Sequence, residues 1–311
     1  MARIGNAAAA VLCGALGVCP YLVALNGSHG SLILVYLTQL PLFLAGLWLG
    51  VVAAALAGLT ALLILLATGG VIAAAFFAAL NAVPVVVLVR QALLARNYGE
   101  GQIEWYPPGL LTAWLTGLGL AAIAAALFLL GGPDGIQSAL REVLAPALDR
   151  LFLAGSPERE DLAGLLALVM PGVVAASWMV MAATNATLAQ GLLARFGAAW
   201  RPSPDLAALT LPIWIPVLLA VAAAAAMFGG GARFVGINVM ILLAVPFCLA
   251  GLAVLHTIAR RLARPAVPLV TLYVLTAVFG WPLLLIALLG LLDSSLALRR
   301  RLAGPQSFGG K

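Results

Sequence analysis

The sequence has very few charged residues. Only 8% of its 311 residues are charged, whereas 64% are hydrophobic and the mean hydropathy is +1.16. Soluble domains carry about 25% charged residues, and even a domain of about 300 residues buries only about three quarters of its chain surface. A soluble fold would therefore leave too much apolar surface in water. The composition predicts an all-α polytopic transmembrane helix bundle, organised as a single transmembrane domain over residues 1–311.

Residues suited to catalysis or metal binding are also scarce. There are two histidines, His29 and His256, and three cysteines that lie inside apolar segments without a C-x-x-C pair. No Walker loop, H-E-x-x-H motif, G-x-S-x-G elbow or dinucleotide-binding fingerprint is present. We therefore expect no enzymatic activity, no cofactor and no metal site.

Carboxylates are nearly absent from the apolar segments. Asp293 alone lies near one, and we expect it to pair with a nearby arginine such as Arg264 or Arg299. Proton-coupled pumps normally carry acids or histidines in mid-membrane. The scarcity of such residues argues against an ion-driven transporter.

Long apolar segments follow one another along the whole chain, and a helical span needs about 20 such residues. Turn signals separate them at 27–31, at Gly69-Gly70 and at 229–231. Only Trp48 and Gly50 mark the division between the second and third segments. We predict ten spans, at 5–25, 31–48, 51–68, 71–95, 109–131, 162–194, 206–228, 234–258, 266–280 and 282–298.

The last two segments are divided at Gly280-Trp281-Pro282, where glycine loosens a helix and proline removes a backbone donor. Arginines precede this region at 260–264 and follow it at 299–301. If both clusters are cytoplasmic, the chain must return to the same side between them. The two segments are then either two full spans or a hairpin that dips partway into the membrane.

The cations test this topology, because cytoplasmic loops carry an excess of arginine and lysine. Ten spans with both termini inside place twelve cations in the cytoplasm and four outside. The cytoplasmic set is Arg3, Arg90, Arg96, Arg195, Arg201, Arg260, Arg261, Arg264, Arg299, Arg300, Arg301 and Lys311, and the external set is Arg141, Arg150, Arg159 and Arg233. The usage of Arg over Lys, with abundant Ala and Gly, is typical of a GC-rich bacterium, so the predicted location is the inner membrane.

One long polar connection, residues 132–161, holds six of the ten acids and is predicted to be external. Apolar residues recur in it at helical spacing, which predicts an amphipathic helix interrupted or kinked at Pro146. This helix either lies on the outer membrane face or packs on the loops of the bundle itself.

Uncharged polar residues within the spans are the candidates for binding. We single out Gln39, Asn81, Asn185 and Asn238, each in a span that also contains proline. A polar side chain in lipid must find a partner, and a proline leaves one backbone carbonyl without its helical donor. These residues either line a cavity for a small polar solute or join helices by hydrogen bonds. Gln39 and Asn81 lie at similar predicted depth and are the better pair for a shared cavity.

Two stretches resemble known families. The run from His256 to Arg261, then Tyr273, residues 289–293 and the arginines at 299–301 resemble the end of the YybS-like family of bacterial multi-pass membrane proteins. The stretch from Leu40 to Gly50 is similar to early helices in the substrate-binding subunits of energy-coupling-factor transporters. This resemblance implies a solute-binding subunit that docks on a coupling subunit, although those subunits have about six spans.

The sequence thus favours an inner-membrane solute-binding or transport component without its own ATPase. The alternative is a structural or assembly factor that scaffolds partner membrane proteins. The expected partners are membrane lipids, a small polar solute and a membrane protein or coupling subunit, with no nucleic acid.

Overall fold

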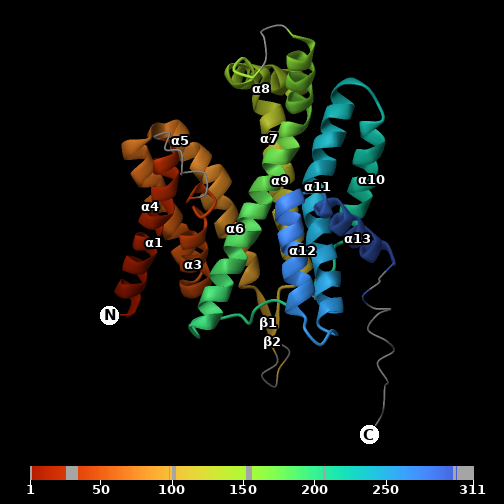
Figure 1. The fold of residues 1–311 in the computed structure, drawn as a ribbon. Coiled ribbons are helices and arrows are strands. Elements are labelled where there is room, and N and C mark those ends of the chain that lie inside the picture. Colours follow the sequence, from red (N-terminus) through yellow and green to blue (C-terminus); the bar gives the residue numbers. More distant parts are fainter. Residues whose placement is uncertain are drawn as a thin grey trace. The chain divides into compact units, whose positions relative to one another are not determined.

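The computed structural model describes residues 2–25, 34–97, 99, 103–151, 156–205, 208–296 and 299. Helices dominate this part of the chain, which confirms the all-α prediction (Figure 1). The strands among the described residues are β1 (Ala95–Asn97) and β2 (Ile103–Trp105), an antiparallel pair with Ala95 opposite Trp105. The sequence pattern does not predict this hairpin, which begins at the last residue of the predicted span 71–95.

The helices follow the predicted segments closely. They are α1 (Ala2–Leu25), α3 (Leu40–Leu49), α4 (Val51–Thr68), α5 (Gly70–Phe77), the π-helix η1 (Ala78–Ala82), α6 (Val83–Ala92), α7 (Pro108–Leu129), α8 (Gly132–Leu148), α9 (Pro157–Arg195), α10 (Trp214–Ala226), α11 (Gly230–Ala259), α12 (Ala266–Phe279) and α13 (Pro282–Leu296). The divisions predicted at Gly50 and Gly280 are confirmed. Both glycines have positive φ, 100° and 71°, which side chains with a Cβ rarely adopt.

Six helical stretches are long and apolar enough to cross a membrane: Gly5–Val23, Val51–Thr68, Gly70–Ala92, Pro108–Leu129, Pro157–Arg195 and Gly230–Ala259. Four shorter apolar helices, α3, α10, α12 and α13, fall in the remaining predicted spans. The described helices therefore support a multi-pass membrane protein.

Two predicted spans are not continuous helices. Within 31–48, residues 34–35 are helical, residues 36–39 form a turn and α3 begins at Leu40. Within 206–228, α10 begins only at Trp214. Prolines explain both corrections, because Pro41, Pro212 and Pro216 have no N–H for a helical bond and restrict the residue before them. Residues 31–33 and 206–207 lie outside the described part of the chain.

Contacts divide the chain into two compact units. Unit 1 comprises residues 1–107 and 180–204, and unit 2 comprises 108–179 and 205–311. The long helix α9 contributes its first part to unit 2 and its last part, from Val180, to unit 1.

In unit 1, α4 packs against α1, α3, α5, η1 and α6. Small residues permit these contacts. A Cβ on Gly14 would overlap the backbone of Ala57, and one on Gly58 would lie 3.0 Å from the Cβ of Ala82. Close approach through small residues is the usual way in which transmembrane helices pack.

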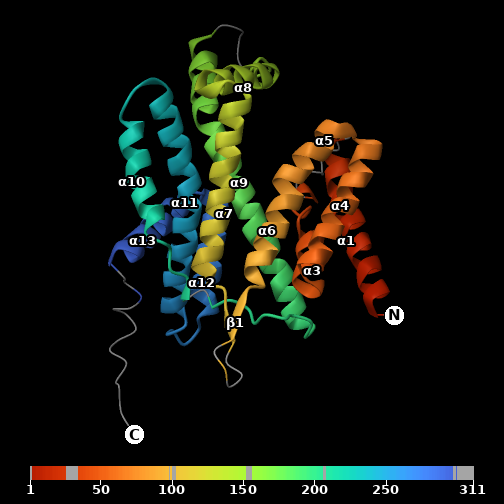
Figure 2. The same ribbon diagram turned by 180° about the vertical axis from the view of Figure 1, so that it is seen from behind.

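In unit 2, α11 packs against α7, α8, α10, α12 and α13 (Figure 2). It packs especially closely against α13, because each helix places a glycine against the backbone of the other. A Cβ on Gly251 would overlap the carbonyl oxygen of Ile286, and a Cβ on Gly290 would overlap that of Phe247.

The segment 132–161, predicted to contain an amphipathic helix, includes α8, which runs through Pro146 without splitting. Its Ile136 and Leu148 are buried, and it packs on α7 and α11. These contacts are made with helices of unit 2.

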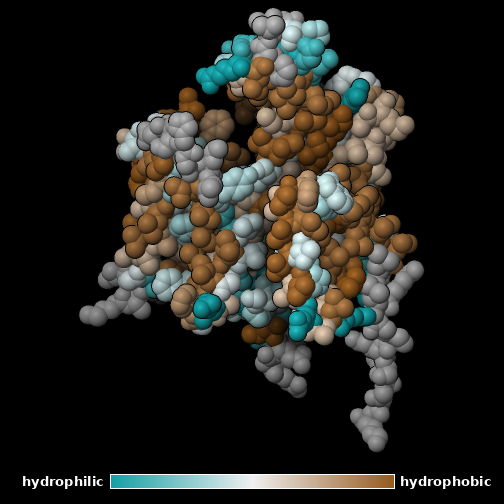
Figure 3. Space-filling view, in the orientation of Figure 1, coloured by the Kyte–Doolittle hydropathy of each residue, from teal (hydrophilic) through white to brown (hydrophobic). Residues whose placement is uncertain are grey.

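Large apolar side chains are exposed over the flanks of the helices, as Figure 3 shows in brown. Val52, Phe128 and Met227 are each more than 80% exposed. Soluble proteins rarely expose apolar patches larger than a few hundred Å², so this surface fits lipid as its solvent.

Candidate functional site

Three of the four candidate residues lie in unit 1, and Asn238 lies in unit 2. Gln39 comes from the turn at 36–39, Asn81 from η1 and Asn185 from α9, and all of them are buried. The structure therefore brings Gln39 and Asn81, the pair favoured from the sequence, into the same unit together with Asn185.

Gln39 connects the turn to η1. Its Nε2 donates a hydrogen bond of 2.9 Å to the carbonyl oxygen of Leu80, the residue before Asn81. In a regular helix that carbonyl would accept from the residue four positions later, which is Pro84 and has no N–H. The proline thus leaves a buried acceptor, and a glutamine from 41 positions earlier donates to it.

The π-helix η1 lies directly before this proline. Single π turns within α-helices are rare and occur frequently at functional sites. Here the widened turn carries the buried side chain of Asn81 and the carbonyl of Leu80. It accommodates the ring of Pro84, which would collide with the carbonyl of Leu80 in a regular α-helix.

Asn185 joins α9 to the same turn. Its Nδ2 donates to the carbonyl oxygen of Tyr36 at 2.5 Å and to that of Met181, one turn earlier in α9, at 2.7 Å. The turn at 36–39 is thus bonded at both ends. Its first residue, Tyr36, accepts from Asn185 of α9, and its last residue, Gln39, donates to Leu80 of η1.

Three buried oxygens around this turn have no hydrogen-bond partner among the described residues. They are Thr38 Oγ1, Gln39 Oε1 and Asn185 Oδ1, and their residues are 1%, 0% and 1% exposed. We call them the acceptor cluster. Most buried polar atoms in native proteins are hydrogen-bonded, so three unpaired oxygens on one turn and its neighbour are unusual.

Sequence reasoning missed Thr38. A threonine in an apolar helix usually bonds to its own backbone, as Thr116 does to Thr112 at 2.8 Å. The available signal was its position beside Gln39 and three residues before Pro41, where a regular helix is interrupted.

Asn238 has a different environment. Its Nδ2 donates to the carbonyls of Leu168 and Phe234, both at 2.8 Å, and its Oδ1 accepts from the N–H of Gly172 at 2.5 Å. A regular helix would pair Leu168 C=O with Gly172 N–H, so the amide bridges two positions of the α9 backbone beside Pro171. These contacts are those of a residue that joins α11 to α9, and Asn238 as a solute ligand stays a prediction.

A buried arginine fixes the hairpin end of unit 1. Arg201 donates to the carbonyl of Ala92, at the end of α6, at 3.0 Å and to that of Tyr106 at 2.9 Å, while its own carbonyl accepts from Gln190. Burial lowers the pKa of this guanidinium, because desolvation disfavours the charged form. The charge is compensated by carbonyls and by the negative end of the α6 dipole.

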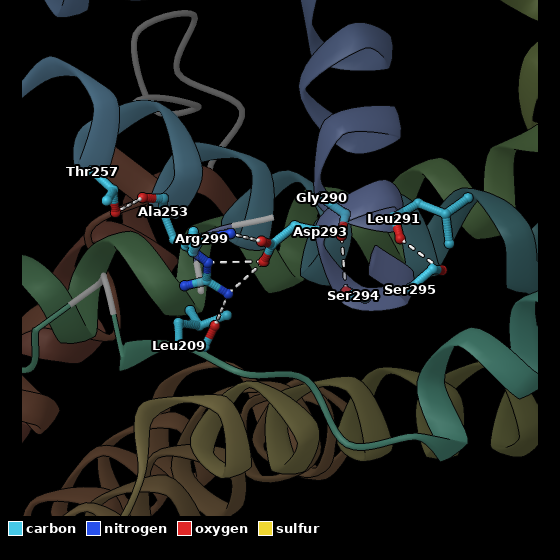
Figure 4. Close-up of polar contacts among 9 residues, drawn as sticks. All are labelled: Leu209, Ala253, Thr257, Gly290, Leu291, Asp293, Ser294, Ser295 and Arg299. Atoms are coloured by element: carbon cyan, nitrogen blue, oxygen red, sulfur yellow. Dashed lines mark hydrogen bonds and ion pairs between the residues drawn. The ribbon is translucent and has the colours of Figure 1, made fainter. Parts of the chain in front are cut away.

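A buried ion pair closes the end of α13 in unit 2 (Figure 4). Asp293 accepts from the backbone N–H of Arg299 at 2.9 Å and pairs with its guanidinium at 2.7 Å; Arg299 also donates to the carbonyl of Leu209. The predicted pairing of Asp293 with Arg299 is confirmed. The carboxylate and the guanidinium are both bonded within the protein, so this ion pair has a structural role in holding the end of α13.

His256 belongs to α11 and contacts the neighbouring α12. Its Nε2 lies 3.3 Å from the hydroxyl of Tyr273, and its Nδ1 lies 2.8 Å from the carbonyl of Leu252. Across the described residues, no group of three or more His, Cys, Asp or Glu side chains is placed to hold a metal ion.

A protein-family model described as "Predicted membrane protein (DUF2232)" matches residues 22–294. This match covers most of the chain and includes the acceptor cluster and most of each unit. No curated protein and no solved structure matches the chain.

Proposed function

The chain belongs to the DUF2232 family of predicted membrane proteins. From the buried oxygens of unit 1 we propose that it is a solute-binding or transport component of the bacterial inner membrane. It has no ATPase of its own and binds a small polar solute within unit 1. The ligands are the oxygens of the acceptor cluster, with Asn81 beside them in η1.

The unpaired oxygens carry this proposal. Leaving a buried acceptor unsatisfied costs about 1–3 kcal/mol, so the three oxygens of Thr38, Gln39 and Asn185 together cost about 3–9 kcal/mol. Whole domains are stable by only about 5–15 kcal/mol. A ligand that binds to these oxygens removes this cost. If the three side chains served only for packing, apolar residues in their place would make the protein more stable.

The test is a ligand screen on the purified full chain. Thermal stability is measured against a library of polar metabolites, and co-purifying molecules are identified by native mass spectrometry. The variants are Gln39→Leu and Asn185→Leu, with Asn238→Leu as the matched control, since its amide is equally buried but fully bonded. Binding lost in the first two and kept in the third supports the proposal; binding that survives in all three contradicts it.

The topology belongs to the same proposal. Ten crossings with both termini in the cytoplasm agree with the asymmetry of the cations, of which Arg3, Arg300, Arg301 and Lys311 fall outside the described side chains. Reporter fusions after Arg96, Arg201 and Arg264 are expected to report cytoplasm, and fusions within 135–160 the outside. A cytoplasmic signal from 135–160 would overturn the ten-span arrangement.

The second candidate function is a scaffold for partner membrane proteins, including a coupling subunit of the kind implied by the energy-coupling-factor similarity. The observation that favours it is α12, an apolar helix with no buried residue. Photo-crosslinkers at Val270 and Val278, both more than half exposed, would join a scaffold to one defined protein in the membrane. Crosslinks to lipid alone would leave this candidate without support.

A further inference from the structure

The acceptor cluster presents lone pairs and almost no donors, and this determines what can bind there. This inference rests on the proposed function and names its ligand. From the arrangement of Thr38, Gln39 and Asn185 we infer that the solute is a monovalent alkali cation held by neutral oxygens.

The orientation of both amides is fixed by their nitrogens. Gln39 Nε2 donates to the carbonyl of Leu80, and Asn185 Nδ2 donates to the carbonyls of Tyr36 and Met181. If either amide were turned over, its oxygen would face those carbonyl oxygens and the bonds would be lost. The oxygens, and not the nitrogens, are therefore the atoms left for a ligand.

The three oxygens belong to one local structure. Thr38 and Gln39 are adjacent in the turn at 36–39, and Asn185 is bonded to the first residue of that turn. Interrupted transmembrane helices are where secondary transporters coordinate coupling ions, using oxygens of the unwound segment. The turn precedes α3 within a predicted span and is an interruption of this kind.

The scarcity of carboxylates in unit 1 narrows the class of ligand. Glu104 is the only acidic residue of unit 1 within the described chain, and it is exposed on β2. Divalent cations are bound mainly through carboxylates, so a site of neutral oxygens suits a single positive charge. An anion would meet mainly lone pairs. A sugar or amino acid would need several donors for its own acceptors, and beyond the Thr38 hydroxyl and the second N–H of Gln39 the cluster offers none.

This ligand is compatible with the scarcity of acids in the predicted spans. The argument drawn from that scarcity against an ion-driven transporter applies to proton coupling, because protons bind to carboxylates and histidines. An alkali ion binds instead to hydroxyl and amide oxygens, which this turn supplies.

The variant that isolates the inference is Thr38→Val. It keeps the side-chain shape and breaks no hydrogen bond made by the hydroxyl, since Oγ1 has no partner among the described residues. Thr116→Val is the matched control, because that threonine is equally buried but its hydroxyl is bonded within α7. Thr38→Ser restores the hydroxyl.

The experiment measures the melting temperature of the full chain in detergent with NaCl or KCl, against choline chloride at equal ionic strength, together with binding of radioactive sodium. We expect an alkali salt to raise the melting temperature of the wild type, Thr38→Ser and Thr116→Val. We expect Thr38→Val to lose this rise and to bind the ion about tenfold more weakly or worse, as the loss of about 1.4 kcal/mol of binding implies.

Three results would overturn the inference. If Thr38→Val is more stable than the wild type by the same amount in every salt, the hydroxyl is an unused polar group. If neither alkali ion binds while a metabolite does, in a manner sensitive to Gln39→Leu, the ligand is not a cation but the proposed function stands. If neither an ion nor a metabolite binds, both proposals fail.

Discussion

Replacing Asn238 with leucine tests whether this amide joins helices or serves a ligand. The side chain is fully buried, and its three hydrogen bonds reach the carbonyls of Leu168 and Phe234 and the N–H of Gly172. Two of these bonds bridge consecutive turns of α9 next to Pro171, where the proline has already removed one helical donor. The substitution removes all three bonds. It leaves the carbonyl of Leu168 and the N–H of Gly172 free to form the helical hydrogen bond with each other.

The expected loss follows from the bonds. Hydrogen bonds of side chains within membrane proteins contribute about 0.6 kcal/mol each and at most about 1.7 kcal/mol. Three of them predict a loss of about 2 kcal/mol in the free energy of unfolding for Asn238→Leu. Gly172→Ala should destabilise the same contact, because a Cβ there would lie 2.8 Å from the backbone oxygen of Asn238.

The assay is reversible unfolding in detergent by titration with a denaturing detergent. The control is Thr276→Val, whose hydroxyl bonds only within its own helix, to the carbonyl of Leu272, and whose effect should be close to zero. The reasoning is refuted if Asn238→Leu unfolds with the wild-type free energy. It is also refuted if the variant keeps its stability and loses binding of a solute.

Three further predictions concern the packing of each unit. Gly251→Ala should cost about 1–3 kcal/mol in unfolding free energy, since overpacking costs about this much and the new Cβ overlaps the α13 backbone; Gly117→Ala, where nothing lies within 4 Å, should cost nothing. Asp293→Ala should cost about 3–5 kcal/mol, because it leaves the guanidinium of Arg299 buried without its counterion; replacing both residues by leucine should restore part of the loss. Arg201→Met should expose amides of the β1–β2 hairpin to faster hydrogen exchange, because two carbonyl contacts disappear; Arg201→Lys, a single point charge, should give an intermediate rate.

Much of the fold could be predicted because the signals were local. Gly50 and Gly280 end helices by their own backbone conformation, and the apolar runs set most helix lengths. The errors arose where an apolar run continues through a proline, as at 36–39 before Pro41 and at Pro212 before Trp214. The β1–β2 hairpin was missed because three-residue strands are too short to show alternation.

The candidate site could be predicted only in part. The rule that proline leaves a carbonyl without its donor pointed to the region before Pro84, but not to the side chain that uses it. That side chain, Gln39, is 41 positions from Leu80, and Asn185 is 149 positions from Tyr36. Such pairings depend on how the helices pack and cannot be read from the sequence. Only the structure shows that both the nitrogen and the oxygen of the Asn238 amide are bonded, whereas the oxygens of Gln39 and Asn185 have no partner.

The most direct test of the site is an experimental density map of the full chain in a lipid nanodisc, with alkali salt present. The account predicts non-protein density within about 3.2 Å, or hydrogen-bonding distance, of Gln39 Oε1 and Asn185 Oδ1, two oxygens of the acceptor cluster. The same density should be missing from a map of Thr38→Val. Protein donors bonded to these oxygens, with no density between them, would contradict the account.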